Sequence, residues 1–207
     1  MNRIEALYSF IDLKDKVVDV GCDQAKLSIM LAKRGQSSIA SDISEKVIDK
    51  ASKDIDSDLI DLRVSNGLEN IKEGEADTLV LAGMGTHTII DILKKTNLKF
   101  NKIITISNNY HDILRREMNN LGYKVETEQI IKENNKFYNL ILFTSGNYNY
   151  SETDLLLGIN HKDLDLYKEY LNHLLNKYKN IKKTSEDKNE KIDNMINLIT
   201  SKLKLLN

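Results

Sequence analysis

Short apolar runs alternate with helix-length amphipathic segments between Val17 and Gly146 of the 207-residue chain. The first five runs are compact and rich in Val, Ile and Leu, which is typical of strands buried on both faces of a parallel sheet. This alternation predicts a doubly wound α/β fold. The predicted strands are Lys16–Val20, Ser38–Ile43, Ile60–Ser65, Asp77–Ala82 and Lys102–Ser107, and the predicted helices are Ala25–Lys33, Glu45–Asp54, Thr88–Lys95 and Asp112–Leu121.

Two further runs, Lys124–Ile131 and Phe137–Thr144, follow a different pattern. The connection between them, centred on Glu133-Asn134-Asn135, is too short for a crossover helix and predicts an antiparallel hairpin. A mostly parallel seven-stranded sheet that ends in such a hairpin is typical of the Rossmann-like class I methyltransferases and not of the nicotinamide dehydrogenases. We therefore predict that α/β fold.

The chain after residue 150 carries a second pattern. Beyond a polar connector, the remainder predicts two amphipathic helices that form a coiled-coil-like hairpin. A capping box from Thr184 to Asp187 is expected to open the second helix. We predict a cofactor-binding catalytic domain over residues 1–150 and a helical hairpin over 151–207. The two apolar stripes are Tyr167, Leu171, Leu174, Tyr178 and Ile181, and Ile192, Met195, Ile199, Leu203 and Leu206.

Composition excludes several classes of protein. The single cysteine, Cys22, rules out an internal disulfide framework, and no His/Cys cluster has metal-ligand spacing. No apolar run approaches the ~18 residues of a membrane span. The first residues lack the features of a signal peptide, so we expect a cytoplasmic protein. The net charge of −1 does not by itself indicate nucleic acid.

The strongest local motif lies where the first predicted strand ends. An apolar strand runs into Asp19-Val20-Gly21 and then into a helix, at the edge where open α/β sheets bind ligands. A single glycine falls short of the G-x-G-x-x-G pyrophosphate fingerprint. The cationic sulfonium and amino acid of S-adenosylmethionine suit Asp19 and the nearby Asp23 better. The alternative is an ordinary strand–helix turn with an aspartate cap.

Asp42 lies at the tip of the second run, just after Ser38–Ala40 and about 20 residues after the glycine loop, where an acidic side chain accepts hydrogen bonds from ribose hydroxyls. Alternatively, Asp42 or Ser44 caps the next helix. Asn66-Gly67 ends the third run, where a polar side chain can bind an adenine amino group or simply form a turn.

The fourth and fifth runs end where a methyl group and its acceptor would meet. Two glycines flank Met84 and leave the backbone exposed, or they only permit close packing of the next helix. Asn109 is a candidate to face the acceptor. His111 is expected to lie in the first turn of the following helix.

Together these motifs resemble the bacterial tRNA adenine-22 N1-methyltransferase family, often called TrmK. Its D-I-G-S-D-H-A-Y-L-P loop, A-G-M-G-G turn, Q-P-N strand end and K-x-Y-E-V-L hairpin have counterparts here in the same order. The matching stretches are Asp19–Leu27, Ala82–Thr86, Ser107–Asn109 and Lys136–Ile141, with Arg3-Ile4, Arg116-Glu117 and Gly122-Tyr123 in register. The similarity spans the chain, including a C-terminal helical hairpin that begins just after Gly158.

The resemblance implies methyl transfer from S-adenosylmethionine to N1 of adenine 22 in tRNA, without a metal, by a monomer or weak dimer. The implied cofactor-binding residues are Asp19, Gly21, Cys22, Asp23, Asp42, Ile43, Asn66, Gly67, Ala82 and Gly83. The implied catalytic residues are Met84, Gly85 and Asn109. Candidate tRNA-binding residues are Arg3, Lys26, Tyr110, Arg115, Arg116, Lys177, Lys179, Lys182 and Lys183.

Between Leu171 and Thr184 the only charged residues are Lys177, Lys179, Lys182 and Lys183, which indicates a phosphate-binding patch or a solvated helix face. The apolar stripes of the hairpin would equally serve dimerisation.

The chain departs from the family pattern in three places, while Asp19, Gly21, Asp23 and Asp42 of the implied cofactor site match it. The His and Tyr of the family's first loop are Gln24 and Lys26 here, its Gln-Pro is Ser107-Asn108, and the acidic residue of its D-G-L turn is Asn66. The alternatives are a methyltransferase that acts on another RNA, a small molecule or a protein, and a non-catalytic RNA-binding relative. An NAD(P)-dependent oxidoreductase is disfavoured by the missing glycines.

Overall fold

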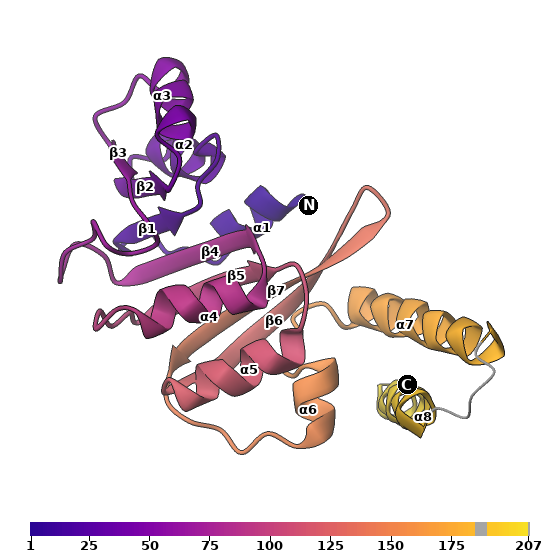
Figure 1. The fold of residues 1–207 in the computed structure, drawn as a ribbon. Helices are drawn as coiled ribbons and strands as arrows, with labels where there is room; N and C mark the ends of the chain where they lie inside the picture. The colour runs from indigo at the N-terminus through magenta and orange to yellow at the C-terminus, as the bar shows by residue number, and fades with distance from the viewer. Residues whose placement is uncertain (185–189, 207) are drawn as a thin grey trace.

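The computed structural model describes residues 1–184 and 190–206, which form one mixed sheet with helices on both faces and a helical hairpin beside it (Figure 1). The strands lie in the order β3-β2-β1-β4-β5-β7-β6. The first five are parallel, and β7 runs antiparallel to both of its neighbours. Their bounds are β1 Val17–Val20, β2 Ser38–Asp42, β3 Ile60–Val64, β4 Thr78–Met84, β5 Lys102–Ser107, β6 Tyr123–Glu133 and β7 Lys136–Ser145. The predicted fold class is confirmed.

Both faces of β1, β2, β5 and the first part of β4 are buried, as their continuous apolar runs predict, whereas the edge strand β3 is partly exposed, in contrast to the prediction. Successive side chains of a strand point to opposite faces, so Leu79 and Leu81 enter the core beneath α4 and α5, whereas Val80 enters the core beneath α1 and α2. The helices that cover the sheet are α1 Arg3–Ser9, α2 Lys26–Lys33, α3 Glu45–Asp54, α4 Thr86–Lys94 and α5 His111–Asn120. The prediction that His111 begins a helix is confirmed.

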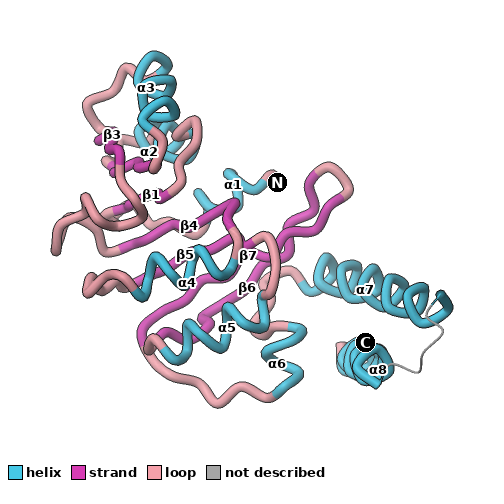
Figure 2. Tube along the Cα trace, viewed as in Figure 1, coloured by secondary structure: helices cyan, strands magenta, loops and turns pink. Residues whose placement is uncertain are grey.

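The β6–β7 hairpin turns through Asn134 and Asn135, whose φ angles of 50° and 60° are typical of a type I′ turn. The antiparallel hairpin is therefore confirmed. Both strands are longer than predicted because backbone pairing continues through polar residues to Glu133 and Lys136. The last residue of β5, Ser107, pairs with Asn139. The hairpin tip thus extends beyond the carboxyl edge of the sheet (Figure 2).

Over residues 151–184 and 190–206 the structure describes three helices rather than the two predicted: α6 Glu152–Leu157, α7 Leu164–Thr184 and α8 Glu190–Leu205. Helix α6 was not predicted because six residues are too few to show a periodic stripe. A capping box between Ser151 and Asp154 begins it. The predicted capping box at Thr184 is wrong, because Thr184 is the last residue of α7 and its hydroxyl donates to Asn180 and Ile181 carbonyls. Its proposed partner, Asp187, lies outside the described residues.

The apolar stripes of α7 and α8 pack within the chain. Tyr167 and Leu171 of α7 and Ile199 of α8 are buried together with Ile130 of β6. The ring of Phe137, on the hairpin, lies 5.5 Å from that of Tyr170. The helical hairpin therefore covers the outer strand of the sheet.

A buried ion pair joins the sheet to the connection that leads into α7. The guanidinium of Arg115 donates to both carboxylate oxygens of Glu128, at 2.8 and 2.6 Å, and to the carbonyl of Leu155 at 2.6 Å. The backbone N–H of Ile159 also donates to Glu128, at 3.1 Å. Arg115 and Glu128 are 1% and 0% exposed. The four groups thus satisfy one another without solvent.

None of the helices in residues 1–184 and 190–206 is long and apolar enough to span a membrane.

Candidate functional site

Two cavities open at the carboxyl edge of the parallel strands. The first, of about 650 Å³, lies between the loop after β1, helix α1 and the β6–β7 hairpin. The second, of about 570 Å³, lies between the ends of β2 and β3 and helix α4. Gly21 lines both cavities, so they meet at the end of β1.

The structure brings the predicted cofactor-binding residues together at these cavities. Asp19, Gly21, Cys22, Asp23, Ala82 and Gly83 line the first, and Asp42, Ile43 and Asn66 line the second with Gly21. Gly67 lines neither, but a Cβ there would lie 3.0 Å from Ile92, a side chain that does. Contact of these residues with a cofactor stays a prediction.

Gly21 permits the tight turn that joins the two cavities. Its φ of +77° is one that residues with a side chain rarely adopt, and a Cβ would lie 2.9 Å from the Met84 methyl carbon. The N–H groups of Gly21 and Cys22 both donate to the Ser41 carbonyl, which ties the loop to β2. Burial, followed by the charge of Asp19, raises the pKa of the Cys22 thiol to about 12. This thiol therefore stays protonated and is a poor nucleophile.

Asp19 is a buried carboxylate on the first cavity, only 6% exposed. It forms neither an ion pair nor a side-chain hydrogen bond with any residue of 1–184 or 190–206. Burial, and then the nearby charge of Asp42, raise its pKa to about 7. A buried charge without a partner is unfavourable. The site is therefore suited to a ligand that brings a cationic or hydrogen-bond-donating group to Asp19.

Asp42 lies at the end of β2 and lines the second cavity. One of its carboxylate oxygens accepts a hydrogen bond from the Ser44 N–H at 3.0 Å, and Ser44 is the N-cap residue of α3. Ser44 therefore occupies the N-cap position of α3, as the alternative interpretation predicts. The Ser44 side chain makes no capping hydrogen bond. The carboxylate of Asp42 retains acceptor capacity for a polar group in the cavity.

Apolar side chains line one part of the second cavity, and polar side chains that include Ser65, Thr88 and Asp91 line the rest. Ile43, Leu68, Ile92 and Leu98 line it, and Ile43 is 69% exposed. The amide of Asn66 donates to Glu69 at 2.7 Å, which holds its carboxamide at the rim. A cavity that combines apolar side chains with several polar ones is suited to a flat heterocycle that carries hydrogen-bonding atoms.

The predicted catalytic residues lie around the end of β4. Gly83, with φ +80°, forms an irregularity in the β4–β5 pairing, and Met84 lines the second cavity. Gly85 and Asn109 line neither cavity. The Asn109 carboxamide oxygen accepts from the Thr86 N–H at 3.3 Å, at the start of α4. A role of Asn109 toward the acceptor stays a prediction.

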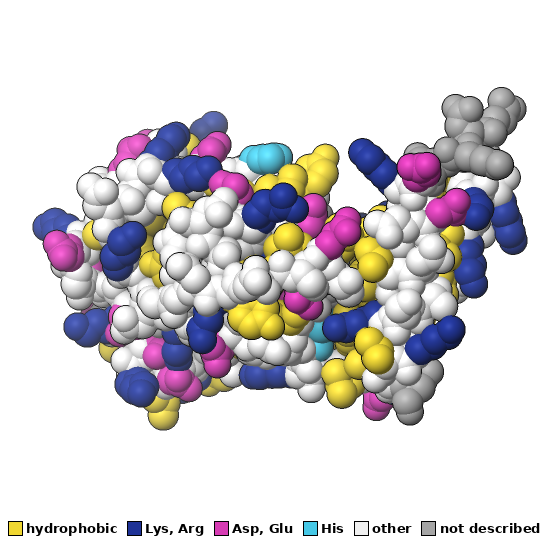
Figure 3. All heavy atoms as spheres, turned by 90° about the horizontal axis from the view of Figure 1, so that it is seen from below, with side chains coloured by type: hydrophobic (Ala, Val, Ile, Leu, Met, Phe, Trp, Pro, Cys, Tyr) yellow, Lys and Arg dark blue, Asp and Glu magenta, His cyan; other side chains and the backbone are white. Residues whose placement is uncertain are grey.

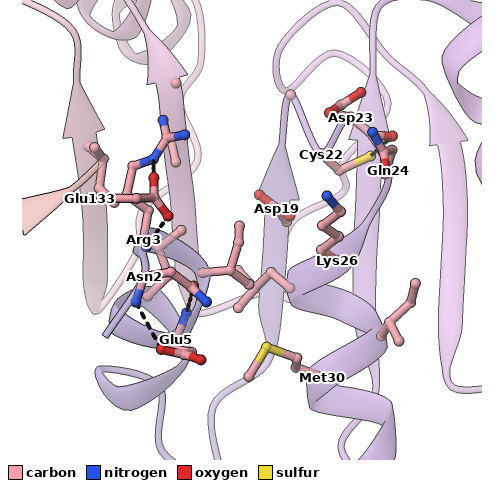
Figure 4. A pocket seen from close by; sticks show the side chains of 18 residues that line it. Asn2, Arg3, Glu5, Asp19, Cys22, Asp23, Gln24, Lys26, Met30 and Glu133 are labelled. Carbon is pink, nitrogen blue, oxygen red and sulfur yellow. Dashed lines mark hydrogen bonds and ion pairs between the residues drawn. The ribbon is translucent and has the colours of Figure 1, made fainter. Parts of the chain in front are cut away.

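The opposite wall of the first cavity was not recognised as part of the site from sequence. Arg3 of α1 and Glu133 of the β6–β7 hairpin face Asp19 of β1, Gln24 of the following loop and Lys26 at the start of α2 (Figure 4). The guanidinium of Arg3 donates to Glu133 at 2.7 Å. Arg3 itself was predicted from the resemblance, whereas no local pattern marked Glu133.

Of the predicted tRNA-binding residues, one is buried and the other eight are exposed or partly exposed. The prediction for Arg115 is wrong, because its guanidinium is buried and paired with Glu128. Lys182 is exposed but paired with Asp193 at 2.5 Å. In Figure 3, basic side chains lie along the outer edge of the helical hairpin with acidic ones close to them. The exposed members are Lys26, Tyr110, Arg116, Lys177, Lys179, Lys182 and Lys183, and Arg3 is partly exposed.

Within the described part of the chain, no group of three or more His, Cys, Asp or Glu side chains is arranged to hold a metal ion.

The sheet and the two cavities define a class of protein. The order 3-2-1-4-5 is that of doubly wound sheets that bind nucleotides at the carboxyl edge. The antiparallel β7 between β5 and β6 distinguishes this sheet from the fully parallel dinucleotide-binding fold. The protein therefore has the Rossmann-like class I methyltransferase fold.

Comparison with known proteins agrees with this class. The model of the methyltransferase domain family matches residues 1–141. The chain belongs to this methyltransferase family.

One curated relative is similar over slightly more residues than the family model matches. The tRNA (adenine(22)-N(1))-methyltransferase of Bacillus subtilis (strain 168) is 28% identical over 153 residues. That match covers 70% of this chain and 64% of the relative, so the chain spans less than two thirds of the curated relative.

Solved structures match over nearly the whole chain. TrmK of M. capricolum, in complex with S-adenosyl-homocysteine, has a TM-score of 0.84 and 26% identity over 100% of this chain and 99% of that one. A Streptococcus pneumoniae protein described as a candidate tRNA (m1A22) methyltransferase, in complex with S-adenosyl-L-methionine, has a TM-score of 0.84 and 25% identity over 97% and 98%.

Proposed function

We propose that the protein transfers a methyl group from S-adenosylmethionine to N1 of adenine 22 in tRNA. The observation that carries the proposal is the unpartnered, buried carboxylate of Asp19, which lines the first cavity close to the point where the two cavities meet at Gly21. The names of the relatives in Bacillus subtilis and Streptococcus pneumoniae support the tRNA substrate. A tRNA substrate also implies a cytoplasmic protein.

The residues present fit this cofactor. Asp19 is placed to bind the ammonium group of its amino acid part, because that cation would give the buried carboxylate its missing partner. Asp42 is placed to accept hydrogen bonds from ribose hydroxyls, and Leu68 and Ile92 to enclose the adenine ring. The cofactor supplies an electrophilic methyl group carried on a sulfonium.

Catalysis in this proposal depends mainly on positioning. The N1 lone pair of adenine is free at neutral pH, so a strong general base is not required. The walls of the first cavity hold the target base against the loop after β1 and exclude water. Binding of the base thereby aligns its N1 atom with the methyl group. Because N1 lies on the Watson–Crick edge, the target base must be unpaired or flipped out of its helix, which costs a few kcal/mol. Met84, Gly85 and Asn109 are the residues proposed to border the reacting atoms.

Labelled cofactor and tRNA transcripts test the proposed function. We expect methyl-labelled S-adenosylmethionine to label a transcript with adenine at position 22 and not the same transcript with guanine there. Label on both transcripts would retain a methyltransferase and exclude position 22. Cofactor binding without label on either would exclude these RNA substrates, and the acceptor would then be sought among other RNAs, small molecules and proteins.

The exposed lysines of α7 are proposed to contact the tRNA backbone. Replacing Lys177, Lys179 and Lys183 together with alanine is expected to weaken tRNA binding about tenfold or more near 0.1 M salt. It should also reduce the salt dependence by about one power of salt concentration for each lost phosphate contact. Filter binding across a salt series measures both quantities.

The matched control for these lysines is the triple alanine variant of Lys46, Lys50 and Lys53, exposed on α3 at the other end of the sheet. It should bind tRNA as the parent does. Unchanged tRNA affinity of the α7 variant together with a change in oligomeric state would instead assign the helical hairpin to dimerisation.

A further inference from the structure

The carboxylate of Glu133 occupies an unusual place for a residue at a hairpin turn. Glu133 pairs with Lys136 three residues beyond the last β5–β7 pair, Ser107 with Asn139. The hairpin therefore carries Glu133 past the edge of the sheet and over the first cavity, which it lines. Figure 4 shows Glu133 on the wall opposite Asp19, with the cavity between them.

Arg3 holds this carboxylate in one orientation. Its guanidinium Nε donates to Glu133 Oε2 at 2.7 Å, and its backbone N–H donates to Oε1 at 3.4 Å. The same guanidinium lies 4.3 Å over the ring of Tyr138. Arg3 is in turn fixed at the start of α1, where Asn2 and Glu5 form a capping box. Because Arg3 holds the Glu133 carboxylate from one side, the remaining lone pairs of its oxygens point in a fixed direction.

Glu133 is ionised at neutral pH. The hydrogen bond from Arg3 lowers the pKa of the Glu133 carboxyl below its ordinary value. A carboxylate has about four lone-pair sites, and Arg3 uses two of them. The Glu133 side chain is 22% exposed, so it can still accept a hydrogen bond from a group inside the cavity.

The chemistry of the target base suits a hydrogen-bond acceptor that is fixed in place and negatively charged. Adenine presents an exocyclic amine, a hydrogen-bond donor, beside N1. When the N1 lone pair forms the new bond to the methyl carbon, the carbon–sulfur bond breaks and its electron pair stays on sulfur. The positive charge passes from the sulfonium to the base, where N1 and the exocyclic nitrogen share it. A carboxylate near the amine therefore binds the transition state more tightly than the neutral base. Guanine presents a carbonyl oxygen at this place, which a carboxylate repels.

We propose that Glu133, positioned by Arg3, is the specificity-determining hydrogen-bond acceptor for the exocyclic amine of the target base. The proposal rests on the proposed adenine N1 methyl transfer and adds the group that selects adenine. It also gives the Arg3–Glu133 pair a role in the acceptor site besides joining α1 to the hairpin.

The test compares adenine with unsubstituted purine at the target position of an otherwise identical transcript. Purine keeps the N1 lone pair and lacks only the amine. We expect Glu133→Gln to lower kcat/KM on the adenine transcript about 10- to 100-fold, the value of one charge-assisted hydrogen bond. On the purine transcript we expect a change of less than threefold. Affinity for S-adenosylmethionine, measured by calorimetry, should be unchanged, because Glu133 lies on the acceptor wall.

Glu126→Gln is the matched control, because it removes a carboxylate from the exposed part of the same strand, away from both cavities. It should leave both transcripts unaffected. Equal losses of Glu133→Gln on the adenine and purine transcripts would overturn the specificity role and leave the methyltransferase function intact. An unmodified protein that binds cofactor and labels neither transcript would overturn the proposed function, and this proposal with it.

Discussion

Replacing Asp19 with asparagine is expected to abolish cofactor binding and, at pH 8, to raise the free energy of unfolding of the cofactor-free protein. Both effects follow from the same buried carboxylate. Without ligand its charge has no partner, and with ligand it pairs with a cation. The difference between a pKa of 3.8 and one of about 7 sets an upper bound of about 4 kcal/mol on the stability gain. Because a buried asparagine amide is also desolvated, we expect about 1–3 kcal/mol.

The pH dependence of stability has a definite sign. In the unfolded chain Asp19 ionises near its ordinary pKa of 3.8, whereas in the folded protein burial and then Asp42 raise this pKa to about 7. Between these values the folded state retains a proton that the unfolded state has released. Stability therefore falls as pH rises through this window, and the loss is complete above pH 7. Asp19→Asn should remove this slope from urea unfolding curves.

Cofactor affinity should show the opposite trend. A cationic group binds only the ionised carboxylate, so affinity for S-adenosylmethionine should rise from pH 5 and level off above the Asp19 pKa of about 7. Asp15→Asn is the matched control. Asp15 is also buried, at 7% exposed, but it is paired with Lys102 at 2.8 Å. That substitution should lower stability and leave cofactor binding unchanged. Retained binding with reduced stability in Asp19→Asn would contradict the role of Asp19.

The second large effect is expected at the buried pair of Arg115 and Glu128. Glu128→Gln leaves the guanidinium of Arg115 charged, buried and without its counter-ion, which costs about 3–5 kcal/mol of folding free energy. Urea unfolding followed by circular dichroism measures the loss. The double variant Arg115→Met with Glu128→Leu should recover most of it, because no unpaired charge remains. A single variant within about 0.5 kcal/mol of the parent would contradict this account.

Substitution of Gly158 tests how closely the backbone packs against the Arg115–Glu128 ion pair. A Cβ there would lie 2.7 Å from Glu128 Oε2 and 2.8 Å from an Arg115 nitrogen, and the φ of +84° is unfavourable for alanine. Gly35 has a similar φ of +79° with nothing within 4 Å. Gly35→Ala therefore measures the backbone contribution alone. Gly158→Ala should be the more destabilising of the two, by the cost of displacing the ion pair.

Features encoded locally were predictable from sequence. The run Asp77–Ala82 is apolar from Leu79 to Ala82 because the first part of β4 is buried on both faces, and its length and composition identify a parallel strand. The connection at Asn134 and Asn135 is too short for a helix, so it identifies the antiparallel hairpin. Asp19, Gly21 and Asp42 were predictable as site residues because strand ends in such sheets converge on one edge.

Features that depend on contacts between distant segments were not predictable. Arg115 was assigned to the surface because a charged residue on an amphipathic helix is usually solvated. Its partner Glu128 lies on a different element, and only their contact explains the burial. Glu133 lies in a polar turn and contacts Arg3, 130 residues away in sequence. Helix α6 depends on a capping box of a few residues rather than on a periodic stripe.

The sequence by itself determined the succession of strands along the chain, the antiparallel end of the sheet and the strand end that carries Asp19, because hydrophobic periodicity and turn length are properties of short segments. Only the tertiary structure decided which charges are buried and which face the cavity. Burial of Arg115 and the placement of Glu133 opposite Asp19 require segments far apart in the chain to meet, and the free energy of a charge depends on those neighbours rather than on the residues adjacent to it in sequence.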